Sequence, residues 1–268
     1  MNIIERNLYR LLRAGIFQTD EKIEPLSAWK WHRLYQMAMM HDIAPQVFQG
    51  LQNCRDQFAV QVPPKLMQEW SQTAIQEKGD ENDLLAPDRL TNPLLNRHLQ
   101  AMLDTEDSNT ETRTALLHLV GIVRFIMNAG IPVKRVAEFG VFLRQSGRRV
   151  DFLRLKKWID QLQLSPMAQL AALMLVKLFH FSADELPFMQ PVGDEQMDRQ
   201  LRELYRQKNS HAEEWYFSQG KNIFVHTSNP SAMLWHIRRS AKYFRYYPTE
   251  MLTNFVTAFA HSLSHIEE

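Results

Sequence analysis

The stretch SNTETRTALLHLVGIVRFIMNAG, residues 108–130, decides the fold class of this chain. Its apolar residues recur every three to four positions, which is the period of an α-helix with one buried face. Ser108 and Glu111 have the spacing of a capping box, and Gly130 stands where a helix would end. The stretch therefore predicts a long helix over about residues 109–129.

Similar signals recur on both sides of this stretch. Prolines or capping residues precede amphipathic runs, as expected at first helical turns. The run LAALMLVKLFHF, residues 170–181, predicts a buried helix, and short connections favour antiparallel neighbours. The predicted fold class is all-α, an antiparallel multi-helix bundle, in which residues 221–228 could add at most a minor β-hairpin. Near the N-terminus the spacing of Leu8, Leu11 and Leu12 is helical, and further predicted helices begin near Pro64, Pro132, Asp151, Pro166 and Pro230.

The charged, loop-forming stretch QEKGDENDLLAPDRL interrupts the amphipathic pattern. It predicts an N-terminal helical subdomain over residues 1–78 and a linker over residues 79–90. A C-terminal helical subdomain, packed with the first, is expected over residues 91–268.

Composition excludes several classes of function. The chain has 31 basic and 30 acidic residues, so no global field directs it to nucleic acid or to an anionic membrane. A single cysteine, Cys54, excludes an internal disulfide and a cysteine-rich zinc site. No apolar run is long enough to cross a bilayer, and the N-terminus lacks the pattern of a signal peptide. We therefore expect a cytoplasmic protein without membrane contact.

Motifs for catalysis or cofactor binding are absent from the sequence, which contains no His-Glu-x-x-His run, phosphate-binding loop or Gly-x-Ser-x-Gly elbow. No cofactor is expected. His261 and His265 have metal-ligand spacing, but an exposed helix face explains them better. The carboxylates Asp80, Glu81 and Asp83 are weak candidates for Mg²⁺, and a solvated linker is the favoured interpretation.

The stretch WHIRRSAKYFRYY combines basic and aromatic residues. On a helix, Arg238, Lys242 and Arg245 share one stripe, with Arg239 beside it, and their donors could hold phosphate groups or a partner. A solvated basic face over a core helix is the alternative, and we favour it.

Four blocks of the sequence carry a resemblance to a known family. The blocks are LTNPLLNRHLQAML (90–103), LLHLVGIVRFIMNAGIPVKRVAEFGVFL (116–143), LPFM (186–189) and RRSAKYFRYYPTEML (238–252). Together they resemble the part that follows the catalytic core in an uncharacterised nucleotidyltransferase family of Bacteroidetes-type genomes. Residues 7–78 also resemble the helical segment that precedes that core.

The catalytic core itself has no counterpart. The resemblance implies a mixed α/β unit with a Gly-Ser turn for nucleotide phosphate and Asp-x-Asp carboxylates for Mg²⁺, yet the chain contains no Gly-Ser dipeptide. GDENDLLAP occupies the position of that unit. A turn that follows the family's long helix is also changed, because Lys134, Arg135 and Glu138 replace its usual pattern. Lys134 and Arg135 are candidate anion-binding residues, and an exposed Lys134–Glu138 pair one turn apart is the favoured alternative.

These observations predict a non-catalytic helical binding or regulatory protein that resembles a family member without its catalytic core. Its partner would be an unknown protein that binds either to the basic stripe of residues 238–245 or to an apolar groove left by the missing core. One rival is a divergent transferase-like protein that binds nucleotide and Mg²⁺. The other is a self-associating structural protein.

Overall fold

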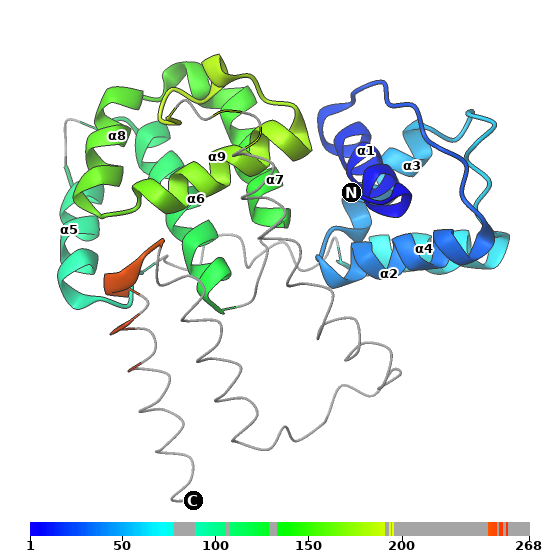
Figure 1. Cartoon of the computed structure of the whole chain (residues 1–268), viewed down its shortest axis with the longest axis horizontal. Helices are drawn as coiled ribbons and strands as arrows, with labels where there is room; N and C mark the ends of the chain where they lie inside the picture. The colour runs from blue at the N-terminus through cyan, green and yellow to red at the C-terminus, as the bar shows by residue number, and fades with distance from the viewer. Residues whose placement is uncertain are drawn as a thin grey trace, which may run out of the picture. The chain divides into compact units, whose positions relative to one another are not determined.

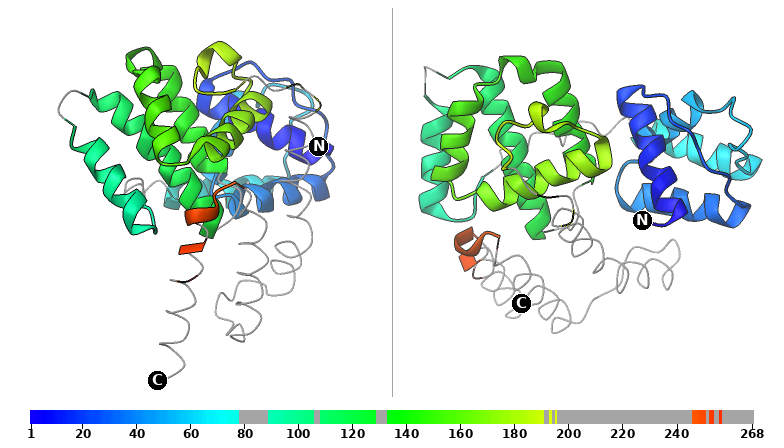
Figure 2. Two further views of the ribbon diagram at one scale, coloured as in Figure 1. Left: turned by 60° about the vertical axis from the view of Figure 1, so that its left-hand side comes forward. Right: turned by 45° about the horizontal axis from the view of Figure 1, so that its top comes forward.

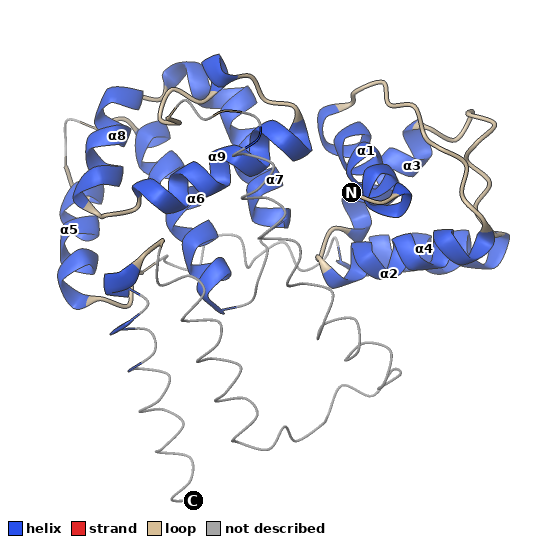
Figure 3. Ribbon diagram, viewed as in Figure 1, coloured by secondary structure: helices blue, strands red, loops and turns tan. Residues whose placement is uncertain are grey.

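A computed structural model describes residues 1–77, 89–105, 108–128, 133–190, 193, 195, 246–250, 252, 253 and 256. Over these residues the chain forms helices joined by loops, without a β-strand (Figure 3). The predicted all-α fold class is thus confirmed. The possible hairpin at residues 221–228 lies outside the described residues.

Figure 1 shows the helices of the described residues. They are α1 (Ile3–Phe17), α2 (Ala28–Met40), α3 (Ala44–Asn53), α4 (Pro64–Glu77), α5 (Pro93–Leu103), α6 (Thr110–Asn128), α7 (Val133–Ser146), α8 (Phe152–Gln161) and α9 (Ser165–Phe179), with the 3-10 turns η2 (Gly147–Arg149) and η3 (Ala183–Glu185).

The chain divides into two compact units that are discontinuous in sequence. Unit 1 comprises residues 1–88, 132–148 and 175–181, and unit 2 comprises the remaining residues. The first division falls between residues 88 and 89, inside the predicted linker. Two later segments return to unit 1, which places α7 with the N-terminal helices.

The long helix predicted from the sequence is α6, and its observed bounds differ from the prediction by one residue at each end. Its cap differs from the expected capping box. Asn109 Oδ1 accepts the hydrogen bond from Thr112 N at 2.9 Å, whereas Ser108 Oγ donates to Thr105 O at 3.0 Å. The cap therefore lies one residue further along the chain, because Asn is as good an N-cap as Ser.

The predicted buried helix is also confirmed as α9. Residues 170–175 are at most 2% exposed, so this helix is apolar around its circumference rather than along one stripe. Asp151 caps α8 as expected, through a hydrogen bond from Arg154 N to its carboxylate at 2.9 Å.

In unit 1, α1 and α3 cross at glycines (Figures 1 and 2). A Cβ atom added to Gly50 would stand 1.8 Å from Leu11 O, and one added to Gly15 would stand 2.0 Å from Gln46 O. The two backbones can approach this closely only because neither glycine carries a side chain. Asn53 Nδ2 donates to Ala14 O at 2.8 Å beside the crossing.

Candidate functional site

Lys134 and Arg135 are the only sequence-predicted anion-binding candidates within the residues that the structure describes, and both lie in the first turn of α7. The other candidates lie outside the described residues. These are the basic residues Arg238, Arg239, Lys242 and Arg245, the carboxylates Asp80, Glu81 and Asp83, and the histidines His261 and His265.

Lys134 forms an ion pair with Asp42, in the turn between α2 and α3. The Nζ–Oδ2 distance is 2.5 Å, and the two side chains are 36% and 64% exposed. The expected exposed Lys134–Glu138 pair is therefore wrong, because a carboxylate distant in sequence comes closer to the ammonium group than the one a turn away. At this exposure the pair contributes at most about 1 kcal/mol.

Glu138 is half-buried. Burial raises the pKa of its carboxyl, and the nearby Asp42 raises it further, while the positive charges of Lys134 and Arg135 oppose the shift. We call Asp42, Lys134, Arg135 and Glu138 the α7 cluster. A carboxyl that holds its proton more readily than usual is one mark of a functional site, although structural networks have it too.

A second charged group, which the sequence analysis missed, surrounds the C-terminal end of α9. Arg13 is 6% exposed and forms two hydrogen bonds with the carboxylate of Glu21, at 2.6 and 2.9 Å. Its Nη1 also donates to Leu178 O at 2.7 Å. A buried arginine thus satisfies a terminal carbonyl of α9 and a carboxylate at once.

Arg144 lies at the same end of α9, where its Nη2 is 3.5 Å from Phe179 O, and it contacts two aromatic rings. Its Cζ atom stands 4.3 Å from the ring centroid of Phe17 and 4.3 Å from that of Phe181. Both distances are within the range of cation–π attraction, which fixes the plane of the guanidinium group.

His180 follows α9 with a left-handed backbone, φ 56°, and an exposed side chain. Partial burial lowers its pKa, as do the charges of Arg13 and Arg144, and Glu21 only partly opposes them. We call Arg13, Glu21, Arg144 and His180 the α9 cluster. The lowered pKa of His180 favours the neutral imidazole. Arg13 and Arg144 donate to the carbonyls of Leu178 and Phe179 at the end of α9. A signal for it existed in the sequence, because Arg13 falls on the buried stripe of α1.

A short segment after α3 is fixed by one side chain. Gln57 Nε2 donates to Glu21 O at 2.7 Å, and Gln57 Oε1 accepts from Ile23 N at 3.0 Å. The next residue, Phe58, is 91% exposed. Cys54 is buried close by, and burial with the neighbouring Glu21 carboxylate raises its thiol pKa, which makes it a poor nucleophile.

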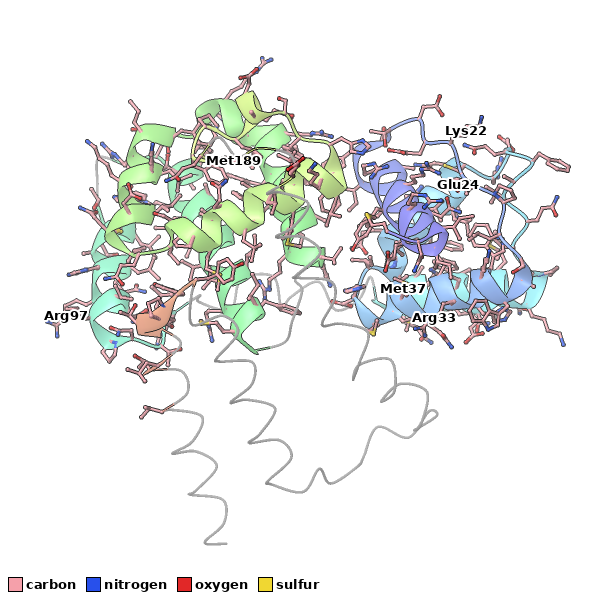
Figure 4. The ribbon with its side chains drawn as sticks, in the orientation of Figure 1. Lys22, Glu24, Arg33, Met37, Arg97 and Met189 are labelled. Atoms are coloured by element: carbon pink, nitrogen blue, oxygen red, sulfur yellow. The ribbon has the colours of Figure 1, made fainter. Side chains whose placement is uncertain are left out.

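Unit 1 exposes further large apolar side chains. Trp29 in α2 is 69% exposed and Ile75 in α4 is 74% exposed. In contrast, Trp31 in α2 and Trp70 in α4 are completely buried in the core of unit 1. Figure 4 shows the side chains of both units and labels Met37 on α2, which is also buried.

Two further properties limit the chemistry of the described part of the chain. It contains no group of three or more His, Cys, Asp or Glu residues arranged to hold a metal ion. None of its helices has the length and apolarity that a bilayer crossing requires.

Comparison with known proteins found no matching family model, no similar curated protein and no similar solved structure.

Proposed function

We propose that the chain is a non-catalytic helical binding protein that resembles a nucleotidyltransferase-family member without its catalytic core. In this proposal unit 1 binds a protein partner through apolar side chains, with Phe58 at the centre of the contact. The observation that carries the proposal is the 91% exposure of Phe58 directly after an anchored residue, Gln57.

Anchoring matters because association must offset the loss of conformational freedom at the interface. Gln57 ties the backbone before Phe58 to the segment of Glu21 and Ile23 before any partner arrives. Aromatic side chains are enriched among the residues that dominate binding energy, and burying a phenylalanine contributes about 1.5–3 kcal/mol.

The charges of unit 1 support an apolar rather than an ionic contact. Glu24 accepts hydrogen bonds from Arg6 at 2.8 and 2.9 Å and from Arg10 at 2.7 Å, next to α1 (Figure 4). The hydrogen bonds with Arg6, assisted by the charges of Arg6 and Arg10, lower the pKa of Glu24 to about 2. Arg13 and Lys134 are also paired to carboxylates, so a charged partner that binds at these residues would have to break existing ion pairs.

The first experiment compares the proteins retained by the immobilised full chain with those retained by Phe58→Ala, in a lysate of the cells that produce it. Leu153→Ala in α8 is the matched control, because Leu153 is 80% exposed but belongs to unit 2. We expect a specific protein to be lost with Phe58→Ala and kept with Leu153→Ala. Equal retention by all three would refute the role of Phe58.

Two measurements separate the proposal from its rivals. Light scattering at micromolar concentration tests self-association: a dimer that Phe58→Ala dissociates would make a second copy the partner. Isothermal titration with nucleoside triphosphates, with and without Mg²⁺, tests the transferase-like alternative. Saturable heat that depends on Mg²⁺ would overturn the non-catalytic assignment and direct mutagenesis to Asp80, Glu81 and Asp83.

A further inference from the structure

Glu250, in unit 2, is a glutamate with no exposed surface. Its two carboxylate oxygens accept hydrogen bonds from backbone N–H groups, Oε1 from Thr91 and Oε2 from Asn92 at 2.8 Å. A buried carboxylate is stable only when such donors replace its lost water. These two residues lie almost 160 positions earlier in the chain.

The carboxylate lies at the entrance to α5. Asn92 is the N-cap of this helix, and its Oδ1 accepts from Leu94 N at 3.0 Å and from Leu95 N at 3.2 Å. Its Nδ2 donates to Thr253 Oγ1 at 3.2 Å. The negative charge of Glu250 therefore stands beside the positive end of a helix dipole, and the cap residue itself holds the same segment.

The same C-terminal segment is anchored at a second place. Tyr247 has no exposed surface, and its hydroxyl donates to Leu162 O at 2.7 Å. Thr249 Oγ1 donates to Gln163 Oε1 at 3.1 Å. Leu162 and Gln163 form the turn between α8 and α9, where Gln163 adopts a left-handed backbone with φ 57°.

We infer that residues 246–250, 252 and 253, here called the strap, form a conformational device that closes unit 2 by joining the entrance of α5 to the α8–α9 turn, with the Glu250 carboxylate as its lock. The strap is drawn in orange-red beside the lower end of α5 in Figure 1 and in the right-hand view of Figure 2. The strap connects Asn92 and Leu162, which are about 70 residues apart in sequence. The helix signals in the sequence are local and do not predict that these two places are joined.

The lock depends on both oxygens of the Glu250 side chain. Glutamate offers an acceptor oxygen to each of the two N–H groups, whereas glutamine offers one oxygen and turns an NH₂ group toward the other N–H. Replacement by glutamine therefore keeps the size but leaves a buried donor unsatisfied. The strap should then open locally while the helices of unit 1 remain unchanged.

The test is hydrogen exchange of the full chain, compared between wild type, Glu250→Gln and Leu153→Ala. We expect Glu250→Gln to speed exchange in the strap and at Thr91 and Asn92 by roughly tenfold or more, with α1 unaffected. Leu153→Ala, which truncates an 80% exposed side chain of unit 2 outside the strap, is the control and should change these rates little. Wild-type exchange of the strap in Glu250→Gln would overturn the inference.

Two further variants keep the inference testable if Glu250→Gln folds poorly. Tyr247→Phe removes the hydroxyl at the other anchor and should still speed exchange at Thr91 and Asn92, because the strap couples the two places. In Glu250→Ala, added acetate should restore slow exchange saturably, while equal chloride should not. Unchanged exchange at α5 in Tyr247→Phe, or no difference between acetate and chloride, would show that the strap is not locked in this way.

Discussion

Replacement of Gly50 by alanine tests the crossing of α1 and α3 most directly. The new Cβ would stand 1.8 Å from Leu11 O and 2.9 Å from Gly15 N. Both are backbone atoms, so no side-chain rotation can relieve the contact. Contacts of Cβ atoms below 3.0 Å essentially do not occur, and the two helices must therefore separate by about 1.2 Å.

That separation has a calculable consequence. A gap of about 0.5–1 Å already forfeits a quarter to a half of the dispersion energy of each contact. The side chains around the crossing, among them Leu8, Leu12, Val47 and Leu51, are all completely buried and would lose such contacts. Overpacking typically costs about 1–3 kcal/mol, and the higher helix propensity of alanine returns only about 1 kcal/mol. Because backbone is pressed against backbone, we expect a net loss of roughly 3 kcal/mol.

The assay is urea unfolding followed by tryptophan fluorescence and circular dichroism, since Trp31 and Trp70 are buried in unit 1. Gly147→Ala is the matched control, because its Cβ would meet only Leu143 Cβ at 3.9 Å, an ordinary contact. We expect the control to stay within about 0.5 kcal/mol of wild type. A Gly50→Ala protein as stable as the control would refute the reasoning.

Three further predictions concern the charged clusters. Arg13→Ala should destabilise the protein to urea by about 3 kcal/mol, because the carboxylate of Glu21 stays buried without its partner, and a loss below 1 kcal/mol would contradict this. The hydrogen bonds and charge of Arg13 lower the pKa of Glu21 in spite of its burial, so wild-type stability should fall as the pH drops through the ordinary carboxyl range and Arg13→Ala should flatten that fall. Glu138→Gln should raise the Tm at pH 7 by about 1–3 °C, because burial raises the pKa of Glu138 in the folded state and its ionisation at pH 7 opposes folding. The gain in Tm should disappear near pH 3.5, where the carboxyl is protonated in both the folded and the unfolded state. A gain in Tm that is independent of pH would count against this cause. Burial and the charges of Arg13 and Arg144 lower the pKa of His180. The pKa of His180 measured by NMR titration should therefore rise in Arg144→Ala but change little in Arg144→Lys. Equal changes in both variants would exclude a charge effect.

The sequence by itself determined the helical class and the position of several helices. Residues 108–130 predicted α6 to within one residue, and residues 170–181 predicted the buried α9, because helical periodicity and end signals are local properties. Even here the cap shifted from Ser108 to Asn109, since neighbouring capping residues compete for the same N–H groups.

The tertiary structure decided which residues meet across the chain. Lys134 pairs with Asp42 rather than Glu138, and Glu250 reaches Thr91 and Asn92. A helical pattern states that a face is buried, but it does not name the helix that buries it. Which groups pair with a charged side chain depends on which helices pack together, because Coulomb and hydrogen-bond energies depend on distance in space and not on separation along the chain.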